Sequence, residues 1–179
     1  MGQNMIIRLR TEKDQAQLEK VNTENLFTNG SMLKSTEAIK KSDCVVVAEL
    51  DGEIVSYIAL TYGNTAMTQY DKLWKKKPED IEGVYIEQIA TLKDFQGKGI
   101  GSQLIDYVKQ NCMRGYKNLF SHVGVINEGS FKLHGKKGFI PIGDFICDDF
   151  YGVKNYRSLL LECNNVKSKQ DEKRLEVVK

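Results

Sequence analysis

The 179-residue sequence lacks any apolar run of about 18 residues, so no helix that spans a bilayer is expected. Residues 1–10 also lack the apolar segment and the small-residue cleavage site of a secretory signal peptide. The default expectation is therefore a cytoplasmic protein with no membrane partner.

Cysteine and histidine are scarce and scattered. The four cysteines are Cys44, Cys112, Cys147 and Cys163, none of which forms a C-x-x-C pair, and there are only two histidines. Because a tetrahedral zinc site normally shows its ligands as close pairs, we expect no metal site. The thiols are expected to be reduced and mostly buried.

The chain also lacks a strong excess of charge of either sign. Its net charge is +2, and residues 164–179 alone carry +2, so the preceding 163 residues are formally neutral. Such a body has no basic field to attract a nucleic acid, and we expect no nucleic-acid partner. The length suits one domain, predicted over 1–163, followed by a frayed charged tail over 164–179.

The spacing of apolar residues predicts an alternation of strands and helices. Strands are expected at 5–10, 44–50, 53–62, 84–92, 118–126, 139–147 and 156–163, and helices at 11–26, 36–41, 98–113 and 128–137. Asp51-Gly52 is a two-residue hairpin signal, and 28–31 is read as a turn. Residues 64–83 are less regular and are interpreted as an excursion with a short helix near 67–75. This order predicts a mixed α/β sheet with helices on both faces and a right-handed strand–helix–strand unit over 84–126.

The most informative segment is DFQGKGIGS, residues 94–102, where a predicted strand ends and a helix begins. Three glycines within five residues disfavour a helix, so another requirement must explain them. Close approach of a ligand to the backbone is one reason, with helix N-terminal N–H groups facing a phosphate or pyrophosphate. Lys98 would then add a charge-assisted contact. From this loop alone, a tight turn without a ligand remains an alternative.

The glycine spacing matches neither of two common phosphate-binding loops. The G-x-x-x-x-G-K-[ST] pattern is absent, and the last glycine of a G-x-G-x-x-G pattern would fall on Ser102. The order Gln96-x-x-Gly99-x-Gly101 instead resembles the pyrophosphate loop [QR]-x-x-G-x-[GA] of the GNAT superfamily of N-acetyltransferases. Residues 87–92 are similar to the fourth strand of that family. Residues 127–139 resemble its pattern N-x-x-[AS]-x-x-L-Y-x-x-x-G-F, and the element order fits over nearly the whole chain except the tail.

The resemblance implies a GNAT fold: a mostly antiparallel, twisted sheet of six to seven strands whose parallel fourth and fifth strands splay apart, with helices on both faces. It also implies acetyl-CoA as the cofactor, with its pantetheine arm pairing like an added strand with the main chain of Ile89, Thr91 and Leu92. The N–H groups of residues 96–102 would hold the pyrophosphate. Asn127 would reach the cofactor, although a simple helix N-cap stays open for it. The full set expected to contact the cofactor is Ile89, Ala90, Thr91, Leu92, Gln96, Gly97, Lys98, Gly99, Ile100, Gly101, Ser102 and Asn127.

Acetyl transfer to an amine requires a base for the amine proton. Strand alternation places Tyr85, Glu87 and Ile89 on one face and Val84, Ile86, Gln88 and Ala90 on the other. Glu87 then lies among uncharged neighbours near the splay, where burial would raise its pKa toward a useful value. The resemblance supports a carboxylate base at this position. A substrate contact or a structural role stays open for Glu87, and Tyr85 is the second candidate.

The departing thiolate also needs a proton, and the family usually supplies it from a tyrosine. His134 occupies that position here, which departs from the pattern, although some branches that resemble phosphinothricin acetyltransferases also carry histidine. An imidazole can protonate a thiolate near pH 7, so His134 is the candidate acid. A packed or solvent-facing histidine stays open for it. His122 is expected to be a hydrogen-bonded core residue.

The resemblance implies an N-acetyltransferase in which a primary amine of a small molecule or peptide attacks acetyl-CoA directly in a ternary complex. The acceptor would enter near 26–32, 64–83 and 144–151. Asp144, Asp148 and Asp149 could attract a cationic amine there, and a simple solvated turn stays open for this cluster. A GNAT-like module that binds acyl-CoA without catalysis is the alternative, and a nucleotide-binding domain of another class is the third reading. Many GNAT proteins dimerise, so a homodimer is an expectation by analogy alone.

Overall fold

The computed structural model describes residues 4–25, 36–63, 82–147 and 155–164. The predicted turn at 28–31 and the short helix near 67–75 lie outside these residues. Asp148 and Asp149 also lie outside them, as does the predicted tail apart from Asn164.

The described elements follow the predicted order; three of them (36–41, 44–50 and 53–62) have the predicted bounds, and the others differ by one to a few residues. They are β1 (Met5–Leu9), a 3₁₀ turn (Glu12–Asp14), α1 (Gln15–Asn25), α2 (Thr36–Lys41), β2 (Cys44–Leu50), β3 (Glu53–Tyr62), β4 (Val84–Thr91), a second 3₁₀ turn (Lys93–Phe95), α3 (Ile100–Asn111), β5 (Asn118–Gly124), α4 (Glu128–Lys136), β6 (Ile140–Cys147) and β7 (Tyr156–Asn164).

The strands form one seven-stranded sheet in the order β1-β2-β3-β4-β5-β7-β6. Every neighbouring pair is antiparallel except β4 and β5, which are parallel. The β4–β5 pairing covers only Val84–Ile86 against Leu119–Ser121. The two strands then diverge, as the sequence resemblance implied, so the remainder of β4 has no strand partner on its β5 side.

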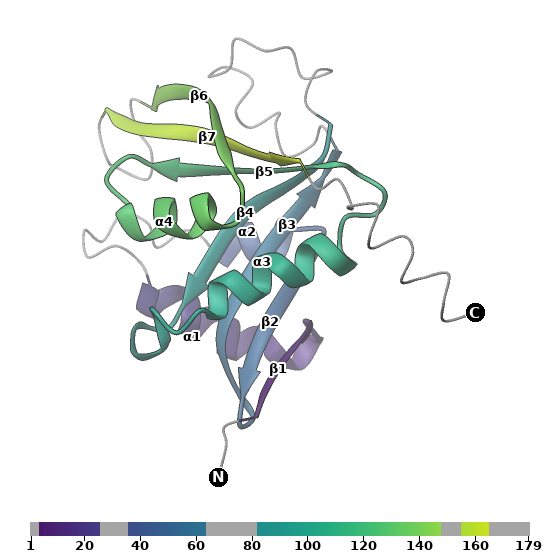
Figure 1. Cartoon of the computed structure of the whole chain (residues 1–179). Helices are drawn as coiled ribbons and strands as arrows, with labels where there is room; N and C mark the ends of the chain where they lie inside the picture. The colour runs from purple at the N-terminus through teal and green to yellow at the C-terminus, as the bar shows by residue number, and fades with distance from the viewer. Residues whose placement is uncertain (1–3, 26–35, 64–81, 148–154, 165–179) are drawn as a thin grey trace.

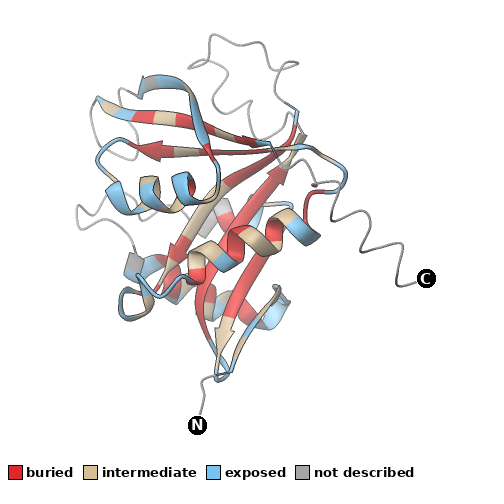
Figure 2. Cartoon of the chain, in the orientation of Figure 1, coloured by how far each residue is buried: buried red, intermediate tan, exposed pale blue. Residues whose placement is uncertain are grey.

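Helices cover both faces of the sheet: α3 and α4 lie in front of it in Figure 1, and α1 and α2 lie behind it. The buried residues gather along the central strands and on the sheet-facing side of α3 (Figure 2). α3 contributes Leu104, Ile105 and Val108 to this core, which is the apolar side that its sequence spacing predicted. None of the described helices combines the length and the apolar character needed to cross a bilayer.

β4 contains a bulge at Glu87 that changes which side chains share a face. Ala59 of β3 pairs with Gln88, and the next residue of β3, Leu60, pairs with Ile86, so Glu87 is the extra residue. The expected alternation is therefore wrong beyond Ile86. Gln88 reaches α1, where its Nε2 donates to Asn22 Oδ1 at 3.1 Å.

Ile89 moves to the opposite face as a consequence of the same bulge. Its Cδ1 lies 3.5 Å from the position that a Cβ would take at Gly101 in α3. Ile89 and Glu87 were expected on one face, and the inserted residue separates them. The bulge leaves Glu87 pointing to the α1 and α2 side, because its carboxyl bonds to Thr61 on β3.

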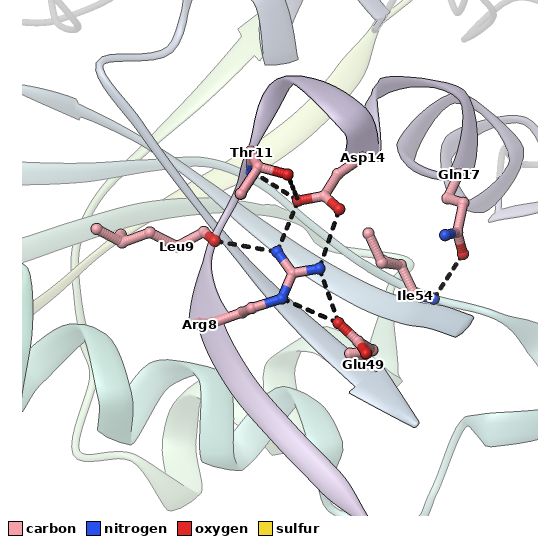
Figure 3. A network of polar contacts seen from close by, with 7 residues as sticks. All are labelled: Arg8, Leu9, Thr11, Asp14, Gln17, Glu49 and Ile54. Carbon is pink, nitrogen blue, oxygen red and sulfur yellow. Dashed lines mark hydrogen bonds and ion pairs between the residues drawn. The ribbon is translucent and has the colours of Figure 1, made fainter. Parts of the chain in front are cut away.

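A polar network joins β1, the first 3₁₀ turn and β2 (Figure 3). The Arg8 guanidinium donates to both oxygens of Asp14, at 2.7 and 3.0 Å, and to Glu49 at 2.7 and 2.9 Å. Asp14 also accepts from the Thr11 N–H at 2.6 Å, which forms a capping box at the start of the 3₁₀ turn. These bonds hold the pKa of Asp14 down to about 2, chiefly through Arg8. The network fixes the start of the helical layer to the edge of the sheet.

Candidate active site

A cavity of about 770 Å³ opens where β4 and β5 diverge. Its walls come from β4, the glycine-rich segment at the start of α3, the end of β5, and α4. Most of the residues predicted to contact a cofactor line it: Ile89, Ala90, Thr91, Gln96, Gly97, Gly99, Ile100, Gly101, Ser102 and Asn127. Glu87 and His134 also line it, so the structure gathers two of the three candidate catalytic side chains and most of the predicted loop in one place.

The main chain of β4 offers hydrogen-bonding groups to the cavity at alternate residues. Leu92 is engaged elsewhere, because its N–H donates to Val55 at 2.9 Å and its carbonyl accepts from Phe95 at 2.9 Å. The prediction that Leu92 offers main-chain groups to a cofactor is therefore wrong. Ala90 faces β3 as well, since its carbonyl accepts from Ser56 Oγ at 2.7 Å. By alternation, Ile89 and Thr91 face the gap, and the Thr91 carbonyl accepts from Gln96 Nε2 at 3.0 Å.

The glycine-rich segment presents the N-terminus of α3 to the same cavity. The first bond of the helix runs from Gln103 N to the Gly99 carbonyl at 3.1 Å, so the N–H groups of 99–102 have no partner within the helix. Gly97 and Gly99 have φ of +74° and +80°, and a Cβ at either would meet no atom within 4 Å. The glycines thus permit both a left-handed backbone and an open approach to these amides. The Gln96 N–H is not available, because it donates to Lys93 at 3.2 Å.

Asn127 caps α4 and lines the cavity at the same time. Its Oδ1 accepts from the Ser130 N–H at 3.0 Å, which confirms the N-cap alternative. The cap uses only the oxygen, so the role predicted for its amide nitrogen toward a cofactor is compatible with it. Lys98 does not line the cavity and instead places Nζ 5.0 Å from the centre of the Phe95 ring. Its predicted contact with an anion stays a prediction.

Two lysines that the sequence reading did not single out also line the cavity. Lys132 and Lys136 are four residues apart on α4 and therefore share one face of the helix. Lys132 also pairs with Glu128 at 3.4 Å on the exposed surface of that helix. The signal available in the sequence was the helical spacing after Asn127, which does not by itself show which face meets the cavity.

Glu87 has the surroundings expected of a general base. Its Oε1 accepts a hydrogen bond of 2.8 Å from Thr61 Oγ1, and burial raises the pKa of its carboxyl while that bond opposes the rise. A carboxyl with a raised pKa binds a proton more firmly than one in water, which suits a group that accepts a proton. The bulge places this group on the wall of the cavity.

His134 has a defined tautomer. Its Nδ1 lies 2.8 Å from the Ser130 carbonyl, which only accepts, so Nδ1 carries the proton. The ring is 1% exposed and packs edge-on against Phe139, with ring centres 4.9 Å apart. Among the described residues, Nε2 has no hydrogen-bond partner. Burial lowers the pKa of the imidazole, so the neutral ring presents a lone pair at Nε2.

Tyr85 and His122 form a pair at the cavity, and only His122 lines it. The Tyr85 hydroxyl is hydrogen-bonded to His122 Nδ1, and the two rings stack with centres 5.9 Å apart. Burial lowers the pKa of His122 to about 4, so this imidazole is neutral near pH 7. The expectation that His122 is hydrogen-bonded is confirmed. His122 lines the cavity, whereas Tyr85 is 1% exposed and does not.

Tyr156 is a further cavity residue that the sequence reading missed. It begins β7, and its hydroxyl lies so close to the backbone of Gly124 that a Cβ there would be 1.8 Å from the oxygen. Burial raises the pKa of this hydroxyl, which therefore stays protonated at neutral pH. Only glycine at the end of β5 leaves room for it.

The predicted acidic cluster is described only at Asp144. Its carboxylate pairs with Arg157 at 2.7 Å on the surface, with both side chains more than half exposed. This pairing offsets its charge, so Asp144 contributes little to the attraction of a cation. Among the described residues, no group of three or more histidine, cysteine, aspartate or glutamate side chains could hold a metal ion.

Comparison with known proteins gives one family and many similar folds. The model of the acetyltransferase (GNAT) family matches residues 8–139, and a search of curated proteins finds no match. Among solved structures, the ribosomal-protein-S18-alanine N-acetyltransferase from Escherichia coli has a TM-score of 0.66 and 12% identity, covering 94% of this chain and 98% of that one. NAA60 from Arabidopsis thaliana, in complex with acetyl-CoA, has a TM-score of 0.65 and 17% identity, covering 90% of this chain and 98% of that one. IAA acetyltransferase from Bacillus cereus has a TM-score of 0.61 and 17% identity, covering 90% of this chain and 99% of that one. At these identities, the likeness shows the fold.

Proposed function

Because the chain belongs to the GNAT family of acetyltransferases, whose model matches residues 8–139, we propose that it transfers an acetyl group from acetyl-CoA to a primary amine. The acceptor is a small molecule or a peptide, and it attacks directly while both substrates are bound. The observation that carries the proposal is one cavity that combines the unpaired edge of β4, the N-terminus of α3 and the partly buried carboxyl of Glu87.

The residues present fit acetyl-CoA. Main-chain groups of Ile89 and Thr91 suit an extended pantetheine arm that adds to the edge of β4. The N–H groups of 97–102 suit its pyrophosphate, because a helix N-terminus favours an anion. Asn127, Lys132 and Lys136 line the same cavity and add polar and cationic side chains to it. When bound, the cofactor supplies an acetyl group that is activated as a thioester.

Glu87 is the proposed base. A primary amine is mostly protonated at neutral pH and becomes a nucleophile only after it loses a proton. The Glu87 carboxylate accepts that proton at Oε1 or Oε2, directly or through a water molecule. The raised pKa of the carboxyl lies closer to the pKa of the amine, and the Thr61 hydrogen bond favours the ionised form.

His134 is the proposed source of the proton for the departing sulfur. Since its resting tautomer has the proton on Nδ1, held by Ser130, the ring first takes up a second proton from water at Nε2. The imidazolium then gives that proton from Nε2 to the departing thiolate, and the ring returns to its neutral form. Burial lowers the pKa of the imidazole, which favours this transfer. Tyr85 remains the second candidate for the base, although its hydroxyl is engaged with His122.

The nature of the acceptor is the least constrained part of the proposal. The E. coli protein with a similar fold is named for an alanine of ribosomal protein S18, and the B. cereus protein is named as an IAA acetyltransferase. One fold thus serves different acceptors, so the acceptor must be selected by side chains around the cavity. A test therefore needs a broad panel of amines.

Calorimetry with acetyl-CoA, followed by a thiol-release assay on polyamines, amino acids, aminoglycosides and peptide N-termini, tests the proposal. Binding together with amine-dependent release of free CoA is the expected result. Binding without release for any amine would favour the non-catalytic acyl-CoA-binding module instead. Absence of binding by the folded protein would refute both, and competition by ATP or NAD would identify the third reading.

A further inference from the structure

Two lysines supply positive charge to the cavity between β4 and β5. Among the described residues that line it, Lys132 and Lys136 are the only lysines or arginines, and Glu87 is the only acidic residue. The two lysines lie four residues apart on α4 and therefore share one side of the helix. Neither takes part in the proposed proton transfers, which leaves their charge available for binding.

α4 lies close to the glycine-rich segment because a glycine stands between the two helices. A Cβ at Gly101, in the first turn of α3, would lie 3.2 Å from Cδ2 of Leu133. Leu133 directly follows Lys132, so the turn of α4 that carries this lysine lies beside the N-terminus of α3. The proposed pyrophosphate site and the lysine pair are therefore neighbouring parts of one cavity.

The covalent structure of acetyl-CoA fixes the order in which its groups meet this cavity. The thioester comes first, then the pantetheine arm, the pyrophosphate, and last the adenosine, whose ribose carries a 3′-phosphate. With the thioester near Glu87 and the arm along Ile89 and Thr91, the adenosine lies beyond the amides of 97–102. Lys132 and Lys136 are both exposed, as expected of side chains that meet the solvent-facing end of a ligand.

The charges indicate which phosphate the lysines bind. The pyrophosphate already has the unpaired N–H groups at the start of α3 as partners. The 3′-phosphate is a monoester, which carries about −1.5 to −2 charges at pH 7. Two ammonium groups match that charge, and lysine binds a phosphate as a point charge without demanding one orientation. The lysine pair thus suits the third phosphate of the cofactor.

We propose that Lys132 and Lys136 bind the 3′-phosphate of coenzyme A and select this cofactor over dephospho-coenzyme A, which lacks the group. The inference rests on the proposed use of acetyl-CoA and specifies which of its phosphates α4 recognises. Glu128 competes with the phosphate, because its carboxylate pairs with Lys132 at 3.4 Å. Those two side chains are 83% and 73% exposed, so their ion pair is weak and the phosphate can replace it.

Calorimetry on the full-length protein at low salt, with coenzyme A and dephospho-coenzyme A as the two ligands, tests the proposal. The wild type should bind coenzyme A more tightly. Lys132→Gln and Lys136→Gln should each weaken its binding by roughly three- to tenfold and leave the affinity for dephospho-coenzyme A unchanged. In the double variant, the two ligands should bind almost equally. Added salt should reduce the preference of the wild type, because exposed charges are screened.

Two further variants separate this contact from a general effect of charge. Lys20→Gln removes an exposed lysine of α1, on the other side of the sheet and outside the cavity, and should leave both affinities unchanged (Figure 1). Glu128→Gln frees Lys132 from its partner and should strengthen the binding of coenzyme A alone.

The outcomes that contradict the inference differ from those that contradict the proposed function. Equal affinity of the wild type for the two ligands overturns the inference, and this measurement needs no variant. Equal weakening of both ligands in the lysine variants also overturns it, because the lysines would then bind the pyrophosphate. Binding of neither ligand by the folded wild type would refute the use of acetyl-CoA itself.

Discussion

Thr61 on β3 donates a hydrogen bond of 2.8 Å to the carboxyl of Glu87, the residue inserted into β4 by the bulge. Without the inserted residue, the alternation of β4 would not bring both Glu87 and Gln88 to the α1 side. Gln88 anchors the strand to Asn22 of α1 at 3.1 Å, while Glu87 is left on the wall of the cavity. The bulge thus determines where the proposed base lies.

The Glu87→Gln variant tests the base directly. Glutamine keeps the size of the side chain and can bond to Thr61, but it cannot take a proton from the amine. We expect kcat to fall by about 10²- to 10⁴-fold, with the dissociation constant for acetyl-CoA unchanged. Steady-state kinetics and calorimetry measure the two quantities. Wild-type kcat in this variant would leave Glu87 with a contact or a structural role only.

The Thr61→Val variant tests the electrostatics of the same carboxyl. Burial raises the pKa of Glu87, and the Thr61 hydrogen bond opposes that rise by stabilising the ionised form. Its loss should raise the pKa further. Because the base must be ionised, the acidic limb of the profile of kcat/KM against pH should move to higher pH. Thr23→Val, which alters an exposed hydroxyl of α1, is the control and should leave the limb in place.

The His134→Ala and His134→Gln variants test the proton donor. Neither side chain titrates near neutral pH, so both should lower kcat by about tenfold or more, while the affinity for acetyl-CoA stays nearly intact. Alanine also leaves a small cavity beside Phe139, whereas glutamine largely fills it, so agreement between the two variants separates chemistry from packing. Unchanged turnover in the glutamine variant would remove His134 from the mechanism.

Much of the fold could be predicted from periodicity and turn chemistry. The hairpin at Asp51-Gly52 has φ of +50° and +90°, as its sequence predicted, because glycine and aspartate tolerate a left-handed backbone. The glycines before α3 were predicted to allow a close approach, and the structure adds that Gly97 and Gly99 also need positive φ. The backbone conformation of a turn depends on its own few residues, so it can be predicted from the local sequence.

The rest depends on register, which local sequence does not carry. An alternation of period two cannot reveal an extra residue in one strand, so Ile89 was assigned to the wrong face. The contact of Tyr156 with Gly124 exists because β5 and β7 pair, with Gly124 opposite Ser158. The side of α4 that carries Lys132 and Lys136 into the cavity is likewise set by packing. Each of these features joins segments whose relative placement only the folded chain defines.

The Asp14→Asn variant tests the network at the edge of the sheet. The Arg8 guanidinium holds the pKa of Asp14 down to about 2, below its unfolded value near 4, so the ionised carboxylate stabilises the fold. We expect a loss of about 2 kcal/mol in the free energy of unfolding at pH 7. The gap between variant and wild type should shrink as pH falls from about 4 towards 2. Denaturant titrations at several pH values measure this difference.

The control is Asp144→Asn, which breaks an exposed ion pair with Arg157. It should change the free energy of unfolding by less than about 0.5 kcal/mol.

Gly124→Ala tests the close contact between the Tyr156 ring and the backbone of Gly124. A Cβ at Gly124 would lie 1.8 Å from the hydroxyl oxygen and 2.4 Å from Cζ of the ring, so the ring must move or the strands must shift. We expect a loss of about 1–3 kcal/mol in the free energy of unfolding.

A double-mutant cycle with Tyr156→Ala tests whether this loss comes from the contact. In the Tyr156→Ala background, Gly124→Ala should lower the free energy of unfolding far less, because the ring atoms that the new Cβ would contact are gone. Gly135→Ala in α4, where a Cβ meets nothing within 4 Å, is the control and should be neutral or slightly stabilising. Additive effects of the two substitutions in a double-mutant cycle would show that Tyr156 does not rest on Gly124 in solution.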